Sequence, residues 1–251
     1  MAGVWVYTLL SVAVVSLVSL VGLLTLSWKT ERLQRVLIYL VSFAAGALLG
    51  DVFIHLIPEV AETGFGVSAA LSLLAGIFVF FVFEKIIHWR HNHIPLHLDH
   101  TQHTHPLAVM NLFGDLVHNF IDGLILGASY LASIPVGLAT TVAVILHEIP
   151  QEIGDFGILL HAGLSRSRAL CYNFLTALGA LAGAVLSLIL NAWLTNITAF
   201  LIPFAAGSFI YIAGADLIPE LHKEVEAGKS VLQLLWFVLG IGIMMLLLFL
   251  E

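Results

Sequence analysis

Residues 36–58 read VLIYLVSFAAGALLGDVFIHLIP, an apolar stretch whose single charged side chain is Asp51. About 20 predominantly apolar residues suffice to cross a bilayer as a helix. Backbone groups in lipid must be hydrogen-bonded within the segment, so a stretch of this length is a helix rather than a barrel strand. The sequence therefore predicts a membrane-spanning helix at residues 36–58.

The rest of the chain has the same character. Its 251 residues are 60% hydrophobic and 10% charged, with a mean hydropathy of +1.05. A soluble globular protein carries about 25% charged residues, so the composition predicts an all-α integral membrane protein with the lipid bilayer as its surroundings. A net charge of −7 without a basic patch argues against a nucleic-acid partner. The single cysteine, Cys171, excludes a disulfide framework and a multi-cysteine metal site.

Apolar runs between charges and turn residues predict eight transmembrane helices in one domain. The first run lacks a basic segment before it, so we interpret it as a span rather than a signal peptide. The predicted spans are residues 4–28, 36–58, 66–88, 107–131, 136–162, 169–192, 197–219 and 230–250.

The basic residues predict the orientation. With eight spans, every Lys and Arg lies at or in a loop on one side of the membrane. The positive-inside rule makes that side cytoplasmic and leaves both termini outside. Because a miscounted span would scatter the charges, their distribution also supports the count. They are Lys29, Arg32, Arg35, Lys85, Arg90, Arg166, Arg168, Lys223 and Lys229.

A motif of the second span recurs in the seventh. FAAG at 43–46 and LIPE at 56–59 return as FAAG at 204–207 and LIPE at 217–220, at a constant offset of 161, with 8 of 17 positions identical. The two spans run in opposite directions, which indicates an inverted repeat of the kind found in many secondary transporters. This repeat would relate spans 1–3 to spans 6–8 and leave spans 4 and 5 as a central pair.

The central pair carries a concentration of polar residues. Span four presents one polar helical face, and span five presents two adjacent polar stripes. At about 2.5–3.5 kcal/mol for each charge at mid-bilayer, five unpaired carboxylates would cost on the order of 10 kcal/mol or more. No Lys or Arg lies between Arg90 and Arg166, so the carboxylates must be protonated, hydrated or paired with an external cation. The residues are Asp115, His118, Asn119 and Asp122 in span four, and His147, Glu148, Gln151, Glu152 and Asp155 in span five.

These residue types predict a site for a divalent metal ion. Imidazole, carboxylate and amide groups form the ligand set of Zn²⁺ and its neighbours, and a site without thiolate releases its ion more readily. The same ligands would serve Fe²⁺, Mn²⁺, Cd²⁺ or Co²⁺ as the substrate. Interhelical hydrogen bonding explains one or two buried polar groups but not nine on facing stripes.

HNFIDG at 118–123 and HEIPQEIGDF at 147–156 resemble the span-four and span-five signatures of the ZIP family of divalent metal transporters. The similarity extends to eight spans, outward termini and a His-rich loop. It implies a 3+2+3 helix arrangement, often a homodimer, and a binuclear site that moves Zn²⁺ or a related ion into the cytoplasm by an elevator motion. The long extracellular domain of many animal members has no counterpart, which suggests a minimal, prokaryotic member in the cell (inner) membrane.

Carried over by position, the family's first metal site maps to His118, Asp122, His147 and Gln151. The second maps to Asn119, Glu148 and Glu152, with Asp122 bridging. Animal members of this type usually have a second His where this chain has Gln151, so the first site should be weaker or prefer another metal.

Other polar residues are predicted to line the ion's route. His55 and Asp216 occupy equivalent positions of the repeat, the first toward the outer mouth with Asp51 and the second toward the exit. Interfacial capping is the alternative explanation. The predicted route comprises Asp51, His55, Asp115, Asp155, His161 and Asp216.

Seven of the twelve histidines crowd the loop at 88–105, on the predicted cytoplasmic side. Neutral imidazoles on such a loop bind Zn²⁺ weakly and exchange it quickly, so the loop would receive or sense the ion. A polar tether without that role is the alternative. The residues are His88, His91, His93, His97, His100, His103 and His105.

Two other function classes compete with import. His147-Glu148 invites comparison with the zinc protease motif, but Gln151 stands where that motif requires its second His. A hydrolase also needs an open coordination position rather than two carboxylate-rich sites. Residue spacing does not give the direction of flux, so a metal exporter or a sensor stays open as an alternative. The sequence predicts a transporter and not an enzyme.

Overall fold

The computed structural model describes residues 2–25, 30–92, 104–193 and 197–250, with a few side chains near the ends of these ranges left out. The described residues form helices joined by short connections, with no strand among them, as the composition predicts. The first half consists of α1 (Ala2–Val18), η1 (Ser19–Val21), α2 (Gly22–Thr25), α3 (Thr30–Asp51), η2 (Val52–Leu56), α4 (Ile57–Thr63), α5 (Val67–Asn92) and α6 (Thr104–Ala132). The second half consists of α7 (Ile134–His161), α8 (Arg166–Ala177), α9 (Gly179–Trp193), α10 (Thr198–Tyr211), η3 (Ile212–Leu217), α11 (Ile218–Leu221), α12 (Ala227–Leu247) and η4 (Leu248–Leu250).

Seven helical segments among the described residues are long and apolar enough to cross a membrane. They indicate a multi-pass membrane protein. The predicted span at residues 107–131 coincides with α6, which has the necessary length but is not among the seven. This helix carries Asp115, His118 and Asp122, so its polar face accounts for its lower apolar character.

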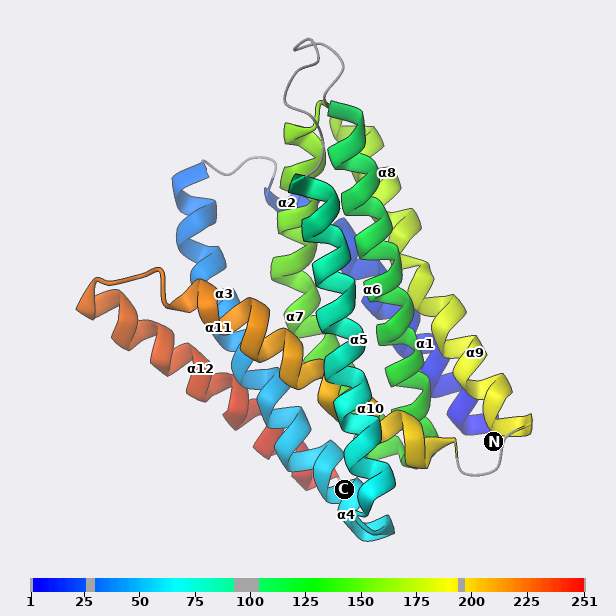
Figure 1. Ribbon diagram of the computed structural model, residues 1–251. Coiled ribbons are helices and arrows are strands. Elements are labelled where there is room, and N and C mark those ends of the chain that lie inside the picture. The colour runs from blue at the N-terminus through cyan, green and yellow to red at the C-terminus, as the bar shows by residue number, and fades with distance from the viewer. Residues whose placement is uncertain (1, 26–29, 93–103, 194–196, 251) are drawn as a thin grey trace.

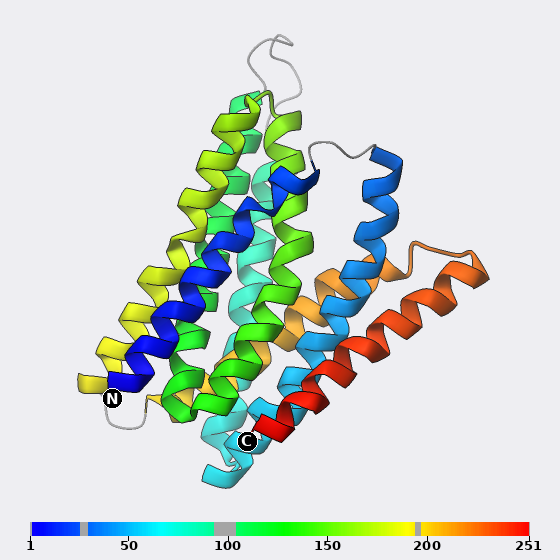
Figure 2. The ribbon, with the colours of Figure 1, turned by 180° about the vertical axis from the view of Figure 1, so that it is seen from behind.

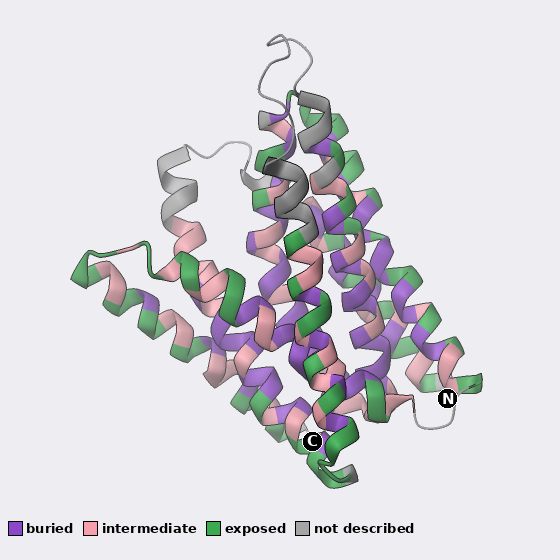
Figure 3. Cartoon of the chain, in the orientation of Figure 1, coloured by how far each residue is buried: buried purple, intermediate pink, exposed green. Residues whose placement is uncertain are grey.

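The long helices lie side by side (Figures 1 and 2). α3 packs along α12, α5 packs along α10, and α6 lies between α7 and α9. Both ends of the described chain lie at the end of the molecule where α6 connects to α7, and α5 ends at the opposite end (Figure 1). Buried residues gather where α6 and α7 face the other helices, whereas exposed residues cover the outer faces (Figure 3).

Paired glycines bring two pairs of helices into close contact. A Cβ on Gly46 would stand 2.0 Å from the Phe237 carbonyl oxygen, where α3 meets α12. A Cβ on Gly207 would stand 1.9 Å from the Leu73 carbonyl oxygen, where α10 meets α5. Gly46 and Gly207 are equivalent positions of the sequence repeat, so the α3–α12 and α10–α5 contacts are built in the same way.

The repeat also marks a distortion shared by two helices. The α-helix widens to a π-helical turn at Val52–Leu56 and again at Ile212–Leu217. Each turn runs into the LIPE motif, whose Pro58 or Pro219 has no N–H to bond the carbonyl four residues earlier. Local π-turns are frequent at functional sites, and these two carry His55 and Asp216.

Candidate metal centre

Four buried side chains from α6 and α7 converge on one point. His118 and Asp122 lie one turn apart on α6, and His147 and Glu148 are neighbours on α7. One ligand atom from each lies within 4.8 Å of the others. The side chains of Asp122, His147 and Glu148 are at most 1% exposed, and that of His118 is 11% exposed.

Five of the six distances between these ligand atoms have the length of an edge of a tetrahedral metal site. The two His Nε2 atoms lie 3.4 Å apart. Asp122 Oδ2 lies 3.6 Å from Nε2 of His118 and 3.2 Å from Nε2 of His147. Glu148 Oε1 lies 3.4 Å and 3.5 Å from the same two nitrogens. Zn–N and Zn–O bonds of about 2.0–2.1 Å give a tetrahedral ligand–ligand edge of about 3.4 Å, so the group has the size of a zinc site.

A backbone contact fixes the ring of His147. Its Nδ1 lies 3.2 Å from the carbonyl oxygen of Ala143, one turn earlier on α7, which that nitrogen can reach only as a donor. With the proton on Nδ1, the lone pair on Nε2 points at the cluster, as metal-binding imidazoles require. Phe80 and Phe209 pack edge-on against the rings of His118 and His147, at centroid distances of 5.8 Å.

Several buried oxygens at the cluster accept no hydrogen bond from the described residues. Both carboxylate oxygens of Asp122 are in this state, as are Glu148 Oε1 and the amide oxygen Oδ1 of Asn119. Leaving buried acceptors without a donor costs free energy. A cation between the four side chains would satisfy the oxygens that face it, so the arrangement can hold a divalent metal ion.

The remaining residues of the predicted second site form a polar group beside this cluster. Asn119 Nδ2 donates to Asp115 Oδ1 over 2.7 Å. Asp115 Oδ2 accepts from Thr176 Oγ1 over 2.5 Å, and Glu152 accepts from Asn173 Nδ2. The sequence analysis missed Asn173 and Thr176 of α8. These two polar residues lie three positions apart in an otherwise apolar predicted span, and this pattern could have marked them as buried partners of the site.

Glu148, assigned by position to the second site, is the fourth member of the four-residue cluster. Gln151 lines a cavity of about 230 Å³ that also reaches His118. Asp115, Asp155 and Asp216 line the same cavity. Glu84 of α5 also lines it and accepts a hydrogen bond from the Tyr211 hydroxyl, and the sequence analysis missed both of these residues.

Asp51 and His55 lie on the other side of the cluster, toward the chain termini. Both are buried. Asp51 Oδ1 accepts from Thr140 Oγ1 of α7 at 3.4 Å, and His55 Nε2 lies 3.0 Å from the carbonyl oxygen of Met244 of α12. Asp51 thus contacts α7 and His55 contacts α12, and neither belongs to the four-residue cluster.

The predicted histidine loop falls largely outside the described residues. His93, His97, His100 and His103 are not described. The backbone places His88 and His91 at the end of α5, His105 at the start of α6 and His161 at the end of α7, and their side chains are not described.

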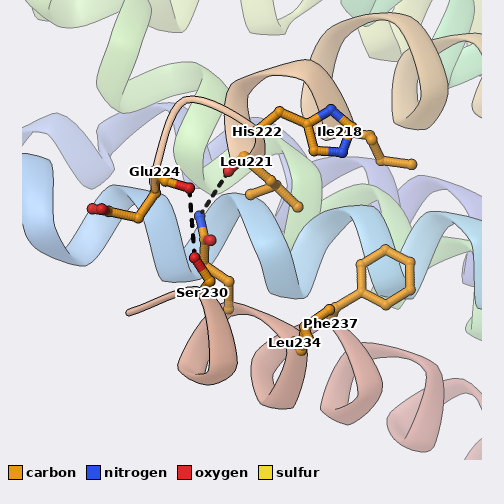
Figure 4. A pocket seen from close by; sticks show the side chains of 8 residues that line it. Ile218, Leu221, His222, Glu224, Ser230, Leu234 and Phe237 are labelled. Carbon is orange, nitrogen blue, oxygen red and sulfur yellow. Dashed lines mark hydrogen bonds between the residues drawn. The ribbon is translucent and has the colours of Figure 1, made fainter. Parts of the chain in front are cut away.

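A separate cavity of about 390 Å³ lies between α11 and α12 (Figure 4). Gln233 Nε2 donates to the Leu221 carbonyl oxygen at 3.4 Å, and Ser230 Oγ donates to that of Glu224 at 3.5 Å. The backbone N–H of Glu226 donates to the Glu224 carboxylate and lowers its pKa. None of the residues that line this cavity belongs to the metal cluster.

Comparisons with known proteins agree with this chemistry. A family model described as ZIP zinc transporter matches residues 2–108 and 96–248. Zinc transporter ZIP13 of Pongo abelii is 35% identical over 96% of this chain and 78% of its own length. Zinc transporter SLC39A7 of Rattus norvegicus is 29% identical over 98% of this chain and 73% of its own length.

A third relative, zinc transporter ZIP10 of Danio rerio, is 42% identical over 58% of this chain but only 18% of its own length. These three relatives are animal proteins, so a prokaryotic source for the chain stays a prediction. The family match spans nearly the whole chain, and the relatives are named as transporters rather than enzymes. The chain belongs to the ZIP zinc transporter family.

Proposed function

We propose that this chain carries Zn²⁺ across its membrane into the cytoplasm, by way of the cluster of His118, Asp122, His147 and Glu148. The observation that carries the proposal is the tetrahedral spacing of the four ligand atoms, 3.2–3.6 Å wherever it is measured, deep in a bundle of apolar helices. Without thiolate, the cluster suits an ion that must leave again. Fe²⁺, Mn²⁺, Cd²⁺ and Co²⁺ are weaker candidates for the same ligands.

A second ion would sit beside the first, held by Asn119, Glu148 and Glu152, with Asp122 between the two. Its support is the free amide oxygen of Asn119 and the buried carboxylate of Glu152, which is oriented by Asn173. Gln151 would then contact the ion as it passes through the adjoining cavity, and would not be one of the four ligands of the cluster. Its place in the lining of that cavity supports this role.

The helices would form eight membrane spans in a 3+2+3 arrangement, with spans 1–3 and 6–8 as inverted repeats. Two features support this arrangement. The close glycine contacts of α3 with α12 and of α10 with α5 use repeat-equivalent residues, and the π-turns at η2 and η3 fall at the same repeat position. α6 would be the span that composition alone does not select, because it faces protein and ions rather than lipid.

Alternating access would come from movement of one group of helices past another. α1, α6, α7, α8 and α9 pack among themselves, α3 packs on α12 and α10 on α5, and the two groups meet where α3 contacts α7 and α10 contacts α6. The cluster belongs to the first group and would travel with it as an elevator. The cavity that reaches His118 supports a state open toward the side where α5 ends and α6 begins.

The direction of flux rests on the orientation of the chain. All nine Lys and Arg residues lie toward that same side in the eight-span topology, which would be cytoplasmic by the positive-inside rule. Both termini are then outside, and the open cavity is the exit. The homodimer and the metal-binding role of the histidine loop stay predictions from the resemblance and the sequence.

The decisive experiment is Zn²⁺ influx into proteoliposomes containing the purified protein. We expect saturable influx that is lost in the double variant His118→Ala/His147→Ala. His222→Ala is the matched control, because it removes an exposed imidazole outside the cluster and should leave influx unchanged. Zn²⁺ binding without flux in the native protein would contradict transport and favour a sensor.

A further inference from the structure

The cavity of about 390 Å³ between α11 and α12 opens where the chain enters its last apolar helix. One wall is α11 with the connection that follows it, and the other wall is the first turns of α12 (Figure 4). Sites that bind small molecules have volumes of roughly 300–1,000 Å³, so the cavity is large enough for a polar ligand group. It shares no residue with the metal cluster or with the cavity that reaches His118.

The lining changes from polar to apolar along α12. Glu224 and Ser230 line the cavity beside the charged connection, and Leu234 and Phe237 line it one to two turns further into the apolar helix. At 1.5 Å per residue, Ser230 and Phe237 are about 10 Å apart along the helix axis. The headgroup layer on each side of a bilayer is about 5–8 Å thick. The cavity therefore extends from the headgroup layer into the hydrocarbon.

An exposed apolar strip continues from the deep end of the cavity. Leu234, which lines the cavity, is 65% exposed, and Val238, one turn later, is 63% exposed. Met245, two turns beyond Val238, is 56% exposed. Residues four and seven positions apart share a helix face, so these side chains form one strip along α12. An acyl chain can lie along this strip while its headgroup enters the cavity.

The polar end of the cavity carries charges of both signs. Oε2 of Glu224 lies 3.5 Å from Nζ of Lys229, whereas that Nζ lies 2.6 Å from Oε2 of Glu226. A hydrogen bond between an ammonium and a carboxylate is normally about 2.7–2.9 Å long. Lys229 thus bonds Glu226 more closely than Glu224, and the Glu224 carboxylate can accept a closer bond from a second ammonium group.

A nearly buried amide lies between the charged end and the apolar end. Gln233 is 5% exposed, and its Nε2 donates to the Leu221 carbonyl oxygen over 3.4 Å. This distance is longer than the usual range of about 2.7–3.2 Å for such a bond. The amide can therefore also bond the phosphate or ester oxygens of a ligand.

The charges around the cavity favour a zwitterionic headgroup. Residues 220–229 include three Glu and two Lys, so a headgroup with net negative charge meets an excess of carboxylates. The primary ammonium of ethanolamine has three N–H donors for Glu224, and its phosphate lies within reach of cationic and hydroxyl groups. The ammonium of choline carries methyl groups in place of these N–H donors and bonds a carboxylate less strongly.

We propose that this cavity binds a phospholipid whose headgroup carries a primary ammonium and no net charge, as in phosphatidylethanolamine. Its ammonium contacts Glu224, its phosphate lies near Lys229 and Ser230, and one acyl chain follows Leu234 and Val238. The bound lipid joins α11 to α12 at the membrane surface. This lipid site goes beyond the proposed Zn²⁺ transport and does not depend on it.

Native mass spectrometry of the delipidated protein tests the choice of lipid. Phosphatidylethanolamine, phosphatidylcholine and phosphatidylglycerol with identical acyl chains are added in turn. We expect the first to bind at least about fivefold more tightly than the second, because a hydrogen bond between charged groups is lost with choline. Equal binding of all three, as for lipids that merely surround the protein, or tighter binding of phosphatidylglycerol, would overturn the proposal.

A matched pair of variants tests the place of the ammonium. Glu224→Gln should remove the preference for phosphatidylethanolamine over phosphatidylcholine. Glu220→Gln is the control, because it removes an exposed carboxylate that pairs with Lys223 and does not line the cavity. Thermal unfolding without added lipid checks that both variants are folded. A preference that persists in folded Glu224→Gln would refute the contact with Glu224.

Photo-cross-linking locates the lipid in the native protein without any variant. Phosphatidylethanolamine with a photoreactive group near the glycerol end of one acyl chain should cross-link to peptides within residues 218–238. Cross-links confined to other helices would contradict the site. These experiments contain no Zn²⁺, so their failure would leave the Zn²⁺ influx experiment as the separate test of transport.

Discussion

Nε2 of His118 and Nε2 of His147 lie 3.4 Å apart across the contact of α6 with α7, at one edge of a four-cornered group. Two neutral imidazole nitrogens at this distance cannot both donate, and hydrogen bonding between the rings does not explain why two carboxylates approach both of them. The metal ion proposed above, shared by all four, would explain it. The predictions below test that geometry and the scaffold that holds it.

The first prediction asks which side chain is the fourth metal ligand: Glu148, as the distances suggest, or Gln151, as the resemblance suggests. We expect Glu148→Ala to weaken Zn²⁺ binding by more than about 100-fold, since loss of a ligand should exceed the 10–100-fold effect of an outer partner. Gln151→Ala should have the smaller effect, because Gln151 lines the cavity beside the group. Calorimetric titration of both variants in detergent measures the difference. A larger loss of Zn²⁺ affinity in Gln151→Ala than in Glu148→Ala would indicate that Gln151 is the fourth ligand.

Coordination geometry can be observed directly with Co²⁺. A four-cornered group of this size should give bound Co²⁺ the intense visible absorption of tetrahedral coordination. Asp122→Asn should reduce that absorption, and Gln151→Ala should leave its shape unchanged. A weak spectrum typical of six-coordinate Co²⁺ in the native protein would contradict a tetrahedral site.

Zinc affinity should fall as the solution is acidified. Two imidazoles and two carboxylates must be deprotonated to bind a metal ion, so protons compete with Zn²⁺. Between about pH 7.5 and 5.5, where imidazoles take up protons, we expect the dissociation constant to rise steadily. Binding titrations across this range measure the effect. An affinity that did not change with pH would be incompatible with two histidine ligands.

The polar group beside the cluster depends on α8. Thr176→Val removes the donor to Asp115 Oδ2 and leaves a buried carboxylate oxygen without its partner, at a cost of about 1–3 kcal/mol of folding free energy. Thr176→Ser keeps the hydroxyl and serves as the control. Thermal unfolding in detergent should show a lower midpoint for the valine variant alone. Equal midpoints for the two variants would mean that the hydroxyl contributes nothing to stability.

The glycine contacts should be intolerant of a methyl group. Gly46→Ala and Gly207→Ala would each put a Cβ about 2 Å from a backbone oxygen of the neighbouring helix, and such overpacking typically costs about 1–3 kcal/mol. Gly242→Ala is the control, since nothing lies within 4 Å of its Cβ position. Unfolding midpoints should fall for the first two variants and not for the third. A tolerated Gly207→Ala would show that α5 and α10 need not approach so closely.

The sequence predicted the elements that depend on local pattern. An apolar stretch in lipid must form a helix, because its backbone groups can then hydrogen-bond within the segment. Residues 36–58 and most of the other predicted spans accordingly lie within helices of the structure. His118 and Asp122 share a face because residues four apart always do in a helix. The cost of uncompensated carboxylates pointed to a cation before any contact was known.

What depends on how helices pack was decided only by the tertiary structure. His147 with Gln151 and Glu148 with Glu152 are equally regular stripes of α7, and the cluster takes one member from each stripe, His147 and Glu148, where they meet His118 and Asp122 of α6. Asn173 and Thr176 gained their roles because α8 lies against α6 and α7. His55 contacts the backbone carbonyl of Met244. Because every residue has such a carbonyl, the sequence could not indicate this contact. The helical repeat determines the face of a helix on which a side chain lies. The distance between two helices, however, depends on the packing of all the side chains between them.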